Sequence, residues 1–198
     1  MVHHIKVVSG HSLLPWLSDA ARLRIEVFRD YPYLYDGDME YELSYLRHYS
    51  ESAQSVFVLA LDNEQVVGVS TAIPLLQADE AFGAPFREHQ MDPEKVFYFG
   101  ESVLSAAWRG KGIGHSFFNE REKFARSLGY TITAFCAVDR APDHPARPAD
   151  YRPLDDFWRV RGYTRRPGLV VQFPWKEIGT ESDQLNSLTF WTRDWGTP

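Results

Sequence analysis

The sequence is poor in cysteine, with Cys136 the only one among 198 residues. Without a second thiol the chain cannot form an internal disulfide, and a reducing, cytoplasmic compartment is the simplest setting for it. Residues 1–6 also lack the apolar stretch of a secretion signal. We therefore expect a cytoplasmic protein.

Long hydrophobic runs and an excess of positive charge are absent as well. The longest apolar stretches, such as residues 56–61, are far too short to cross a bilayer. Lysines and arginines number 21 against 27 aspartates and glutamates, and the net charge of −6 argues against a nucleic-acid partner. Histidines and cysteines do not occur in pairs with metal-ligand spacing, so we expect no bound metal. An acidic chain is compatible with a cationic small substrate.

The composition is that of a globular domain. Hydrophobic residues make up 44% of the chain and aromatic residues 15%, which excludes a disordered protein. The sequence contains no internal repeat, low-complexity tract or composition shift that would mark a linker. We expect residues 1–198 to form one domain.

The hydrophobic pattern predicts a mixed α/β fold. Apolar residues at helical spacing alternate with short apolar runs that are typical of strands. Strands are expected at residues 4–8, 55–61, 65–75, 96–105, 130–138, 169–173 and 188–191, and helices at 13–28, 41–49, 77–90, 113–128 and 154–161.

A glycine-rich turn at residues 108–115 connects an expected strand to an expected helix. Gly110, Gly112 and Gly114 remove the side chains that would keep a ligand from the backbone. The helix amino terminus that follows favours an anion, and Arg109 and Lys111 add positive charge. The turn therefore predicts a pyrophosphate site, with a ligand-free connection as the alternative.

Spacing distinguishes among the known phosphate-binding turns. A P-loop requires Ser or Thr after its lysine, whereas Gly112 follows Lys111 here. In a dinucleotide-binding fingerprint the third glycine would come one residue later than Gly114. Asp139 lies at a suitable distance in sequence for a ribose contact, which leaves the dinucleotide interpretation open.

The pattern Arg109-x-x-Gly112-x-Gly114 instead resembles the acetyl-CoA motif of the GCN5-related N-acetyltransferases, the GNAT family. Residues 126–130 are similar to that family's exit from the helix after the motif, and residues 157–163 to its short fourth helix. The resemblance implies a central, mostly antiparallel sheet with a splayed strand pair, flanked by helices.

The resemblance also implies acetyl-CoA as cosubstrate and assigns residues to it. Backbone groups of Val103, Leu104 and Ser105 would pair with the pantetheine arm, and an N–H near Leu104 would face the thioester oxygen. The pyrophosphate would be held by Arg109, Gly110, Lys111, Gly112, Ile113, Gly114 and His115.

Glu101 is the candidate general base. It is the only charged side chain in residues 96–105, and burial in so apolar a strand would raise its pKa. Related acetyltransferases often carry a glutamate on this strand that acts through water. The alternative is a glutamate that faces solvent or pairs with an arginine.

The candidate acid departs from the family pattern. GNAT enzymes commonly place a tyrosine four residues before the glycine of the fourth helix, where this chain has Trp158. An indole supplies no usable proton. Tyr151 and His144 are therefore the candidates, unless the thiolate leaves unassisted.

Two irregular segments are candidates for acceptor binding. Residues 31–38 are turn-rich and carry Tyr33, Tyr35 and Asp36, which would wall a pocket and face an ammonium group unless they simply pack beneath the loop. The proline-rich residues 141–153 carry His144 and Arg152, and an arginine there would hold a carboxylate on the acceptor.

These features predict an N-acetyltransferase that acts on a primary amine of a small molecule, or of a peptide, by direct attack in a ternary complex. Two alternatives are a non-catalytic acyl-CoA-binding sensor on the same fold and a dinucleotide-binding oxidoreductase. The sequence does not determine the oligomeric state, and a homodimer is compatible with it.

Overall fold

A computed structural model describes residues 4–196, so residues 1–3 of the amino-terminal segment considered above and residues 197–198 lie outside it. The strands are β1 (His4–Ser9), β2 (Val56–Asp62), β3 (Gln65–Pro74), β4 (Val96–Tyr98), β5 (Ser102–Leu104), β6 (Ile132–Val138), β7 (Thr164–Lys176) and β8 (Asp183–Asp194). The α-helices are α1 (Leu17–Phe28), α2 (Met39–Glu51), α3 (Glu80–Glu88), α4 (Ile113–Ser127) and α5 (Asp155–Val160). Short 3-10 helices are η1 (Gly10–Trp16), η2 (Leu75–Gln77), η3 (Pro93–Lys95) and η4 (Ala106–Trp108).

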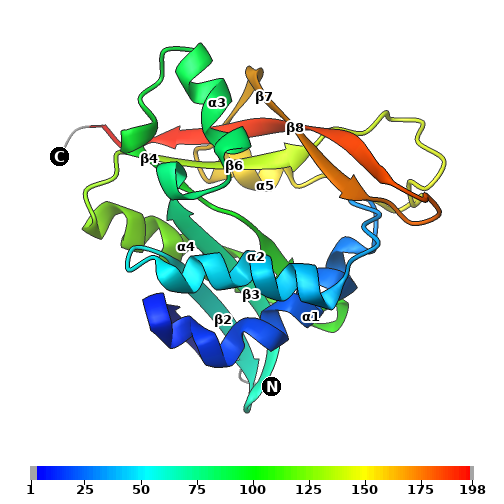
Figure 1. The fold of residues 1–198 in the computed structure, drawn as a ribbon, viewed down its shortest axis with the longest axis horizontal. Helices are drawn as coiled ribbons and strands as arrows, with labels where there is room; N and C mark the ends of the chain where they lie inside the picture. The colour runs from blue at the N-terminus through cyan, green and yellow to red at the C-terminus, as the bar shows by residue number, and fades with distance from the viewer. Residues whose placement is uncertain (1–3, 197–198) are drawn as a thin grey trace.

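The eight strands form one sheet with helices on both faces (Figure 1). The strand order is β1-β2-β3-β4-β6-β8-β7, and β5 pairs with β3. The β4–β6 pair is parallel and the other pairs are antiparallel. The predicted mixed α/β fold with a mostly antiparallel sheet is thereby confirmed. None of the described helices is long and apolar enough to cross a membrane.

Each face of the sheet has its own hydrophobic core. The apolar stripe of α1, which includes Leu17, Leu23 and Phe28, packs with α2 on one face. On the other face Phe117 and Phe118 of α4 pack toward the sheet. Apolar residues spaced three or four apart produce both stripes, as the sequence predicts.

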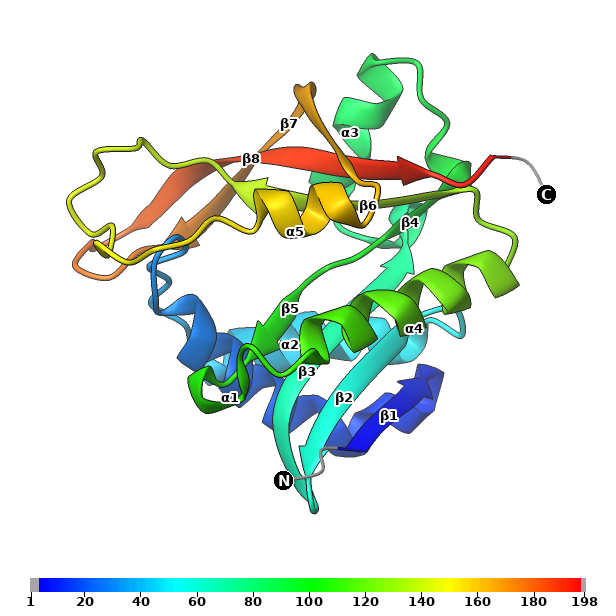
Figure 2. The same ribbon diagram turned by 180° about the vertical axis from the view of Figure 1, so that it is seen from behind.

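The strand expected at residues 96–105 is broken, which corrects the prediction of one continuous strand. The chain follows β3 throughout, but Phe99, Gly100 and Glu101 interrupt the ladder between β4 and β5. The Phe99 N–H still donates to the Ala134 carbonyl of β6 at 2.8 Å. Beyond that point β5 remains paired with β3, and β6 remains paired with β8. Strands β5 and β6 therefore diverge, and we call the space between them the splay (Figure 2).

The last two strands are longer than the sequence pattern indicated. Apolar runs predicted strands at residues 169–173 and 188–191, whereas β7 and β8 extend to 13 and 12 residues. Residues 164–168 of β7 and 183–185 of β8 are all exposed, so no alternation of buried and exposed positions marks them. A register shift between Arg166 and Val170 further interrupts the pattern in β7.

Candidate active site

The free backbone edge of β5 faces the splay. The Glu101 carbonyl accepts a hydrogen bond from the Thr71 N–H at 3.0 Å, and the Ser105 N–H donates to the Val67 carbonyl at 2.9 Å, so both residues pair with β3. Alternate residues of a strand direct their backbone groups to opposite sides. The backbone groups of Leu104 therefore point away from β3, toward the splay.

The glycine turn between β5 and α4 has a backbone conformation that other residues rarely adopt. Gly110 and Gly112 have φ angles of +75° and +81°, and a Cβ on either would meet nothing within 4 Å. Conformation rather than crowding therefore requires glycine, and the space above the turn is open. Gly112 caps α4 without a side-chain hydrogen bond, which leaves first-turn N–H groups for an anion.

Two exposed cations flank this turn. The Nε of Arg109 donates to the Leu104 carbonyl at 3.3 Å, which holds the guanidinium beside the end of β5. The Lys111 amine lies 4.4 Å from the centroid of the Trp108 ring. Open space, unpaired N–H groups and positive charge together fit a pyrophosphate.

Glu101 belongs to a buried triad with Arg24 of α1 and Glu42 of α2. The Nη1 of Arg24 lies 2.7 Å from Oε2 of Glu101, and its Nε contacts Oε2 of Glu42. Glu42 is fully buried, and Glu101 and Arg24 are 6% and 9% exposed. Oε1 of each glutamate is buried without a hydrogen-bond partner among the described residues. One guanidinium thus serves two carboxylates.

Burial dominates the electrostatics of the triad. Desolvation raises the pKa of Glu101, while the positive charge of Arg24 opposes the shift and the negative charge of Glu42 adds to it. The pairing with an arginine and the raised pKa were alternatives in the sequence analysis, and the structure shows both together. A carboxyl of raised pKa remains suited to accept a proton near neutral pH.

Tyr33, Tyr45 and Tyr49 lie around the triad, and Tyr98 lies beyond them beside Cys136. The guanidinium of Arg24 lies 4.5 Å from the Tyr45 ring centroid, and the Tyr45 and Tyr49 hydroxyls are 3.2 Å apart. Burial raises the pKa values of Tyr33, Tyr45, Tyr49 and Tyr98 well above their usual range. These phenols therefore stay protonated and act as hydrogen-bonding groups.

A buried arginine from the opposite face fixes the break between β4 and β5. Arg121 of α4 is 1% exposed, and its Nη1 donates to the carbonyls of Thr71 and Glu101 at 3.2 and 3.1 Å. Its Nη2 donates to the Ser102 hydroxyl at 2.8 Å. The guanidinium thus adds a second donor to two carbonyls that already accept backbone N–H groups, and it links α4 to β3 and β5 at the break.

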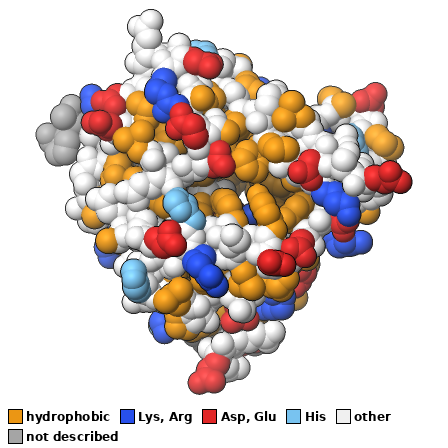
Figure 3. Space-filling model, viewed as in Figure 1, with side chains coloured by type: hydrophobic (Ala, Val, Ile, Leu, Met, Phe, Trp, Pro, Cys, Tyr) orange, Lys and Arg blue, Asp and Glu red, His pale blue; other side chains and the backbone are white. Residues whose placement is uncertain are grey.

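The surface is hollowed beside this cluster. Figure 3 shows a hollow near the centre of one face, between α2 and the β7–β8 hairpin, with hydrophobic side chains inside it and acidic, basic and histidine side chains around its rim. The partly buried apolar side chains of the elements around it are Tyr33, Tyr45, Cys136, Val138, Phe173 and Trp175.

A profile of the Acetyltransferase (GNAT) family matches residues 20–149, which is more than half of the chain. The match contains the splayed strands, the glycine turn and the triad. The chain belongs to the GNAT acetyltransferase family. Acetyl-CoA is the cosubstrate typical of GNAT enzymes.

Solved GNAT structures share the fold at low sequence identity. A ribosomal-protein-alanine N-acetyltransferase from Brucella melitensis is 14% identical, with a TM-score of 0.62 over 96% of this chain and 99% of its own. Salmonella typhimurium yncA, solved with its cofactor acetyl-CoA, is 13% identical, with a TM-score of 0.62 over 100% and 96%. An N-acetyltransferase from Staphylococcus aureus Mu50 is 13% identical, with a TM-score of 0.60 over 99% and 100%. No curated protein matches the chain.

The residues predicted to hold acetyl-CoA form one continuous segment from β5 to the start of α4. The side chain of Ile113 is buried, so only its backbone groups are available to a GNAT cosubstrate. Val103 is buried and, like Ser105, directs its backbone N–H to β3, so Leu104 is the residue of the three whose backbone groups face the space between β5 and β6. The side chains of Arg109, Lys111 and His115 are exposed. His115 is already engaged, since its Nδ1 lies 3.2 Å from Nη1 of Arg161. Their contacts with acetyl-CoA stay a prediction.

The acceptor residues predicted from residues 31–38 lie in different surroundings. Tyr33 is half-buried, with its ring centroid 4.2 Å from that of Phe28. Tyr35 is buried, and desolvation followed by the Glu42 charge raises its pKa. Asp36 forms ion pairs with Lys176 at 2.9 Å and Arg29 at 3.6 Å, which lower its pKa. Of the three, Tyr33 is the best placed to meet an acceptor.

The proline-rich loop packs against the same segment. The rings of His144 and Tyr151 lie 5.7 and 4.7 Å from that of Tyr31, while Arg152 is exposed. Trp158, at the position of the GNAT tyrosine, packs on Phe135 instead, with ring centroids 5.0 Å apart. Tyr151 as the acid stays a prediction.

Sequence reasoning missed the partners of Glu101. Arg24 and Glu42 lie on the apolar faces of their helices, beside Ala20 and Leu46. A charged residue at a core-facing position is the signal that could have identified them, because such a charge requires a buried partner. Arg121 carries the same signal on α4, next to Phe117.

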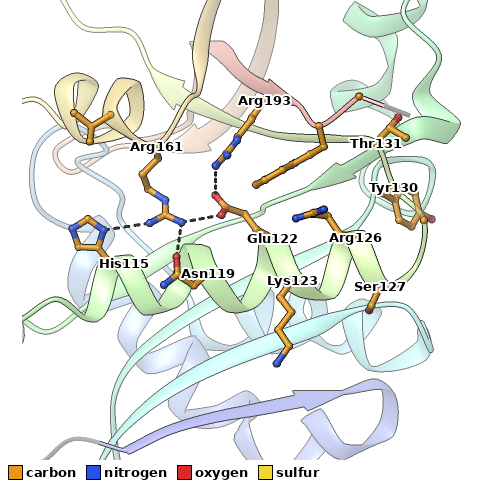
Figure 4. Close-up of a pocket in the computed structure, with 14 residues that line it drawn as sticks. His115, Asn119, Glu122, Lys123, Arg126, Ser127, Tyr130, Thr131, Arg161 and Arg193 are labelled. Carbon is orange, nitrogen blue, oxygen red and sulfur yellow. Dashed lines mark hydrogen bonds and ion pairs between the residues drawn. The ribbon is translucent and has the colours of Figure 1, made fainter. Parts of the chain in front are cut away.

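A separate groove lies on the other face, between α4, α5 and the end of β8. It has a volume of about 850 Å³. The Glu122 carboxylate forms ion pairs with Arg161 at 2.9 Å and with Arg193 at 3.7 Å. The charged side chains at the centre of the groove are thus paired with one another (Figure 4). The groove reaches His115 at the start of α4, one of the residues predicted to hold acetyl-CoA.

The structure contradicts the dinucleotide alternative. Asp139 is engaged by Arg165 and by the Thr189 hydroxyl, each at 2.7 Å, and a loop rather than a further parallel strand-helix unit follows it. The described residues also contain no group of three or more side chains able to hold a metal ion.

Proposed function

We propose that this chain transfers the acetyl group of acetyl-CoA to a primary amine of a small molecule by direct attack in a ternary complex. The observation that carries the proposal is the free edge of β5. It leads from Glu101 at the strand break to the glycine turn at Gly112 without interruption. A thioester placed along this edge would lie between a proton acceptor and an anion site.

The glycine turn would hold the pyrophosphate and β5 the pantetheine arm. Acetyl-CoA supplies an activated acetyl carbonyl. The Leu104 N–H is directed toward the splay and would donate to the oxygen of that carbonyl, where negative charge develops. Glu101 would accept a proton from the ammonium group, directly or through water, which frees the nitrogen lone pair.

The reaction then exchanges one bond for another. The nitrogen–carbon bond forms as the carbon–sulfur bond breaks, the thiolate leaves with the electron pair, and the nitrogen releases its second proton to solvent. Tyr151 or solvent returns a proton to the sulfur. A free thiol has a pKa of about 8.5, so departure without an acid is feasible.

Thiol release tests the enzymatic claim. The chain is mixed with acetyl-CoA and a panel of primary amines, and free CoA is measured with a chromogenic disulfide, while NAD binding serves as the calorimetric control. Amine-dependent release supports the proposal. Tight acetyl-CoA binding without release from any amine would favour the sensor alternative.

The single cysteine supports a cytoplasmic setting for this reaction. The proposed partner is the amine acceptor alone, without nucleic acid or membrane.

A further inference from the structure

We infer that the acceptor is a primary amine carried as a single positive charge on an aromatic or apolar body. This inference rests on the proposed function and adds the chemical class of the acceptor. Two observations carry it: the incomplete charge balance of the buried triad and the aromatic side chains beside it.

With both carboxylates ionised, the triad holds two negative charges against one positive charge. Arg24 alone serves Glu42 and Glu101, and the carboxylates have buried oxygens without a hydrogen-bond partner among the described residues. Unpaired buried oxygens are unfavourable, and an ammonium group would supply the missing charge and donors. Acidic side chains at the rim of the hollow would also attract a cation (Figure 3).

Aromatic side chains form the walls beside the triad. Tyr33 and Trp175 have ring centroids 5.9 Å apart, and the Trp175 Nε1 donates to the Tyr33 carbonyl at 3.1 Å. Both are half-buried, so they retain surface for a ligand. Tyr45 adds a third ring through its contact with Arg24. Such walls fit an apolar body and stabilise a nearby cation.

The same arrangement disfavours two other acceptor classes. A carboxylate beside the amine would lie near Glu101 and Glu42, and like charges repel strongly where water is excluded. Arg140 and Lys176, the cations beside Tyr33 and Trp175, would not neutralise such a carboxylate, because Arg140 already pairs with Glu177 at 2.6 Å and Lys176 with Asp36. A flexible dication would leave its second charge against aromatic walls without a carboxylate partner.

The test compares three primary amines by kcat/KM with acetyl-CoA in excess. 2-Phenylethylamine carries one charge on an aromatic body, phenylalanine adds a carboxylate, and 1,5-diaminopentane replaces the ring by a second amine. We expect 2-phenylethylamine to exceed each of the others by about 10-fold or more, which corresponds to about 1.4 kcal/mol.

Variants of Trp175 test whether the aromatic side chains cause the preference for 2-phenylethylamine. Trp175→Ala is expected to lower kcat/KM for 2-phenylethylamine by about 10- to 100-fold and to leave 1,5-diaminopentane nearly unchanged. Trp16→Ala removes a half-buried indole on η1, near Lys6, and is the matched control. If Trp175→Ala does not fold, Trp175→Phe and Trp175→Leu replace it, and only the phenylalanine variant should keep the preference.

The outcomes separate this inference from the proposed function. Turnover that favours phenylalanine or 1,5-diaminopentane would overturn the inference while the acetyltransferase assignment stands. Equal losses in Trp175→Ala and Trp16→Ala would overturn it as well. Release of no thiol from any of the three amines or from the wider panel would overturn both.

Discussion

Glu101 is the residue on which the proposed chemistry depends most. Its ionised form accepts the proton, and burial raises its pKa, so kcat/KM should rise with pH as the carboxyl ionises. Glu101→Gln should lower kcat by about 10²- to 10⁴-fold and remove this acidic limb, with the affinity for acetyl-CoA unchanged. Steady-state kinetics over a pH series check both effects.

A thermal scan separates this loss from misfolding. A raised pKa means that the folded state binds the proton more tightly than the unfolded state, so stability from Glu101 is lost as pH rises through that pKa. A neutral glutamine removes the cost of ionising a buried carboxyl at neutral pH, so the melting temperature of Glu101→Gln should not fall below that of the wild type. Full activity in Glu101→Gln would exclude Glu101 as the base.

Cys136 is a half-buried thiol on β6 and should react slowly in the native protein. Desolvation raises its pKa to about 12, and its Sγ lies 3.3 Å from the Tyr98 hydroxyl. Because the thiolate is the reactive form, a chromogenic disulfide should label it at least 10-fold more slowly in buffer than in denaturant. Equal rates would show that the thiol is accessible and ionised.

At the scale of elements, Arg121 is expected to hold the strand break in place. Arg121→Met would remove the charged second donor of the Thr71 and Glu101 carbonyls and the donor to the Ser102 hydroxyl, at a cost of about 1.5–3 kcal/mol. The KM for acetyl-CoA should rise as well, since β5 borders the cosubstrate. Burial lowers the pKa of Arg121 to about 10, so the guanidinium is still charged at neutral pH.

Arg126→Met is the matched control for this prediction. Arg126 lies on the same helix but is exposed, and its replacement should change stability by no more than about 0.5 kcal/mol. Urea unfolding and steady-state kinetics measure the two effects. Equal stability of both variants would contradict the role assigned to Arg121.

Elements with a local signal could be predicted from sequence, whereas the strand break could not. Helices α2 and α4 follow from apolar residues at helical spacing, and the glycine turn from its spacing before α4. Phe99 and Gly100 look like the continuation of an apolar strand. A Cβ on Gly100 would collide with the Tyr49 hydroxyl and lie 2.7 Å from Thr71 Oγ1. Such contacts come from residues far away in sequence.

The candidate site shows the same division. Glu101 and the cosubstrate segment lie on one stretch of chain with a recognisable motif. Arg24, Glu42 and Trp175 come from three other elements, and only the fold brings them beside that stretch. A single sequence does not show which distant segments lie side by side. The residues around the acceptor were therefore predicted less completely than those around the cosubstrate.

At the scale of the whole molecule, the sheet should unfold as one unit. The short strand β4 joins its two halves, since it pairs with β3 through two residues and with β6 through three. The two hydrophobic cores add contacts across this seam. We expect far-ultraviolet circular dichroism and fluorescence of the six tryptophans to report one coincident transition in urea. Two separated transitions would contradict a single domain.

The most direct test of the account is a calorimetric titration of acetyl-CoA into the wild type and two glycine variants. Gly112→Asp places a carboxylate where the pyrophosphate would lie. Gly129→Asp is the control, because Gly129 also has a positive φ, +86°, and open space around it, but lies at the far end of α4. Gly112→Asp should weaken binding by about 100-fold or more, as expected for an unscreened like-charge contact at an anion site, while Gly129→Asp binds like the wild type. Equal affinity in all three proteins would contradict the assignment of the glycine turn as the acetyl-CoA site.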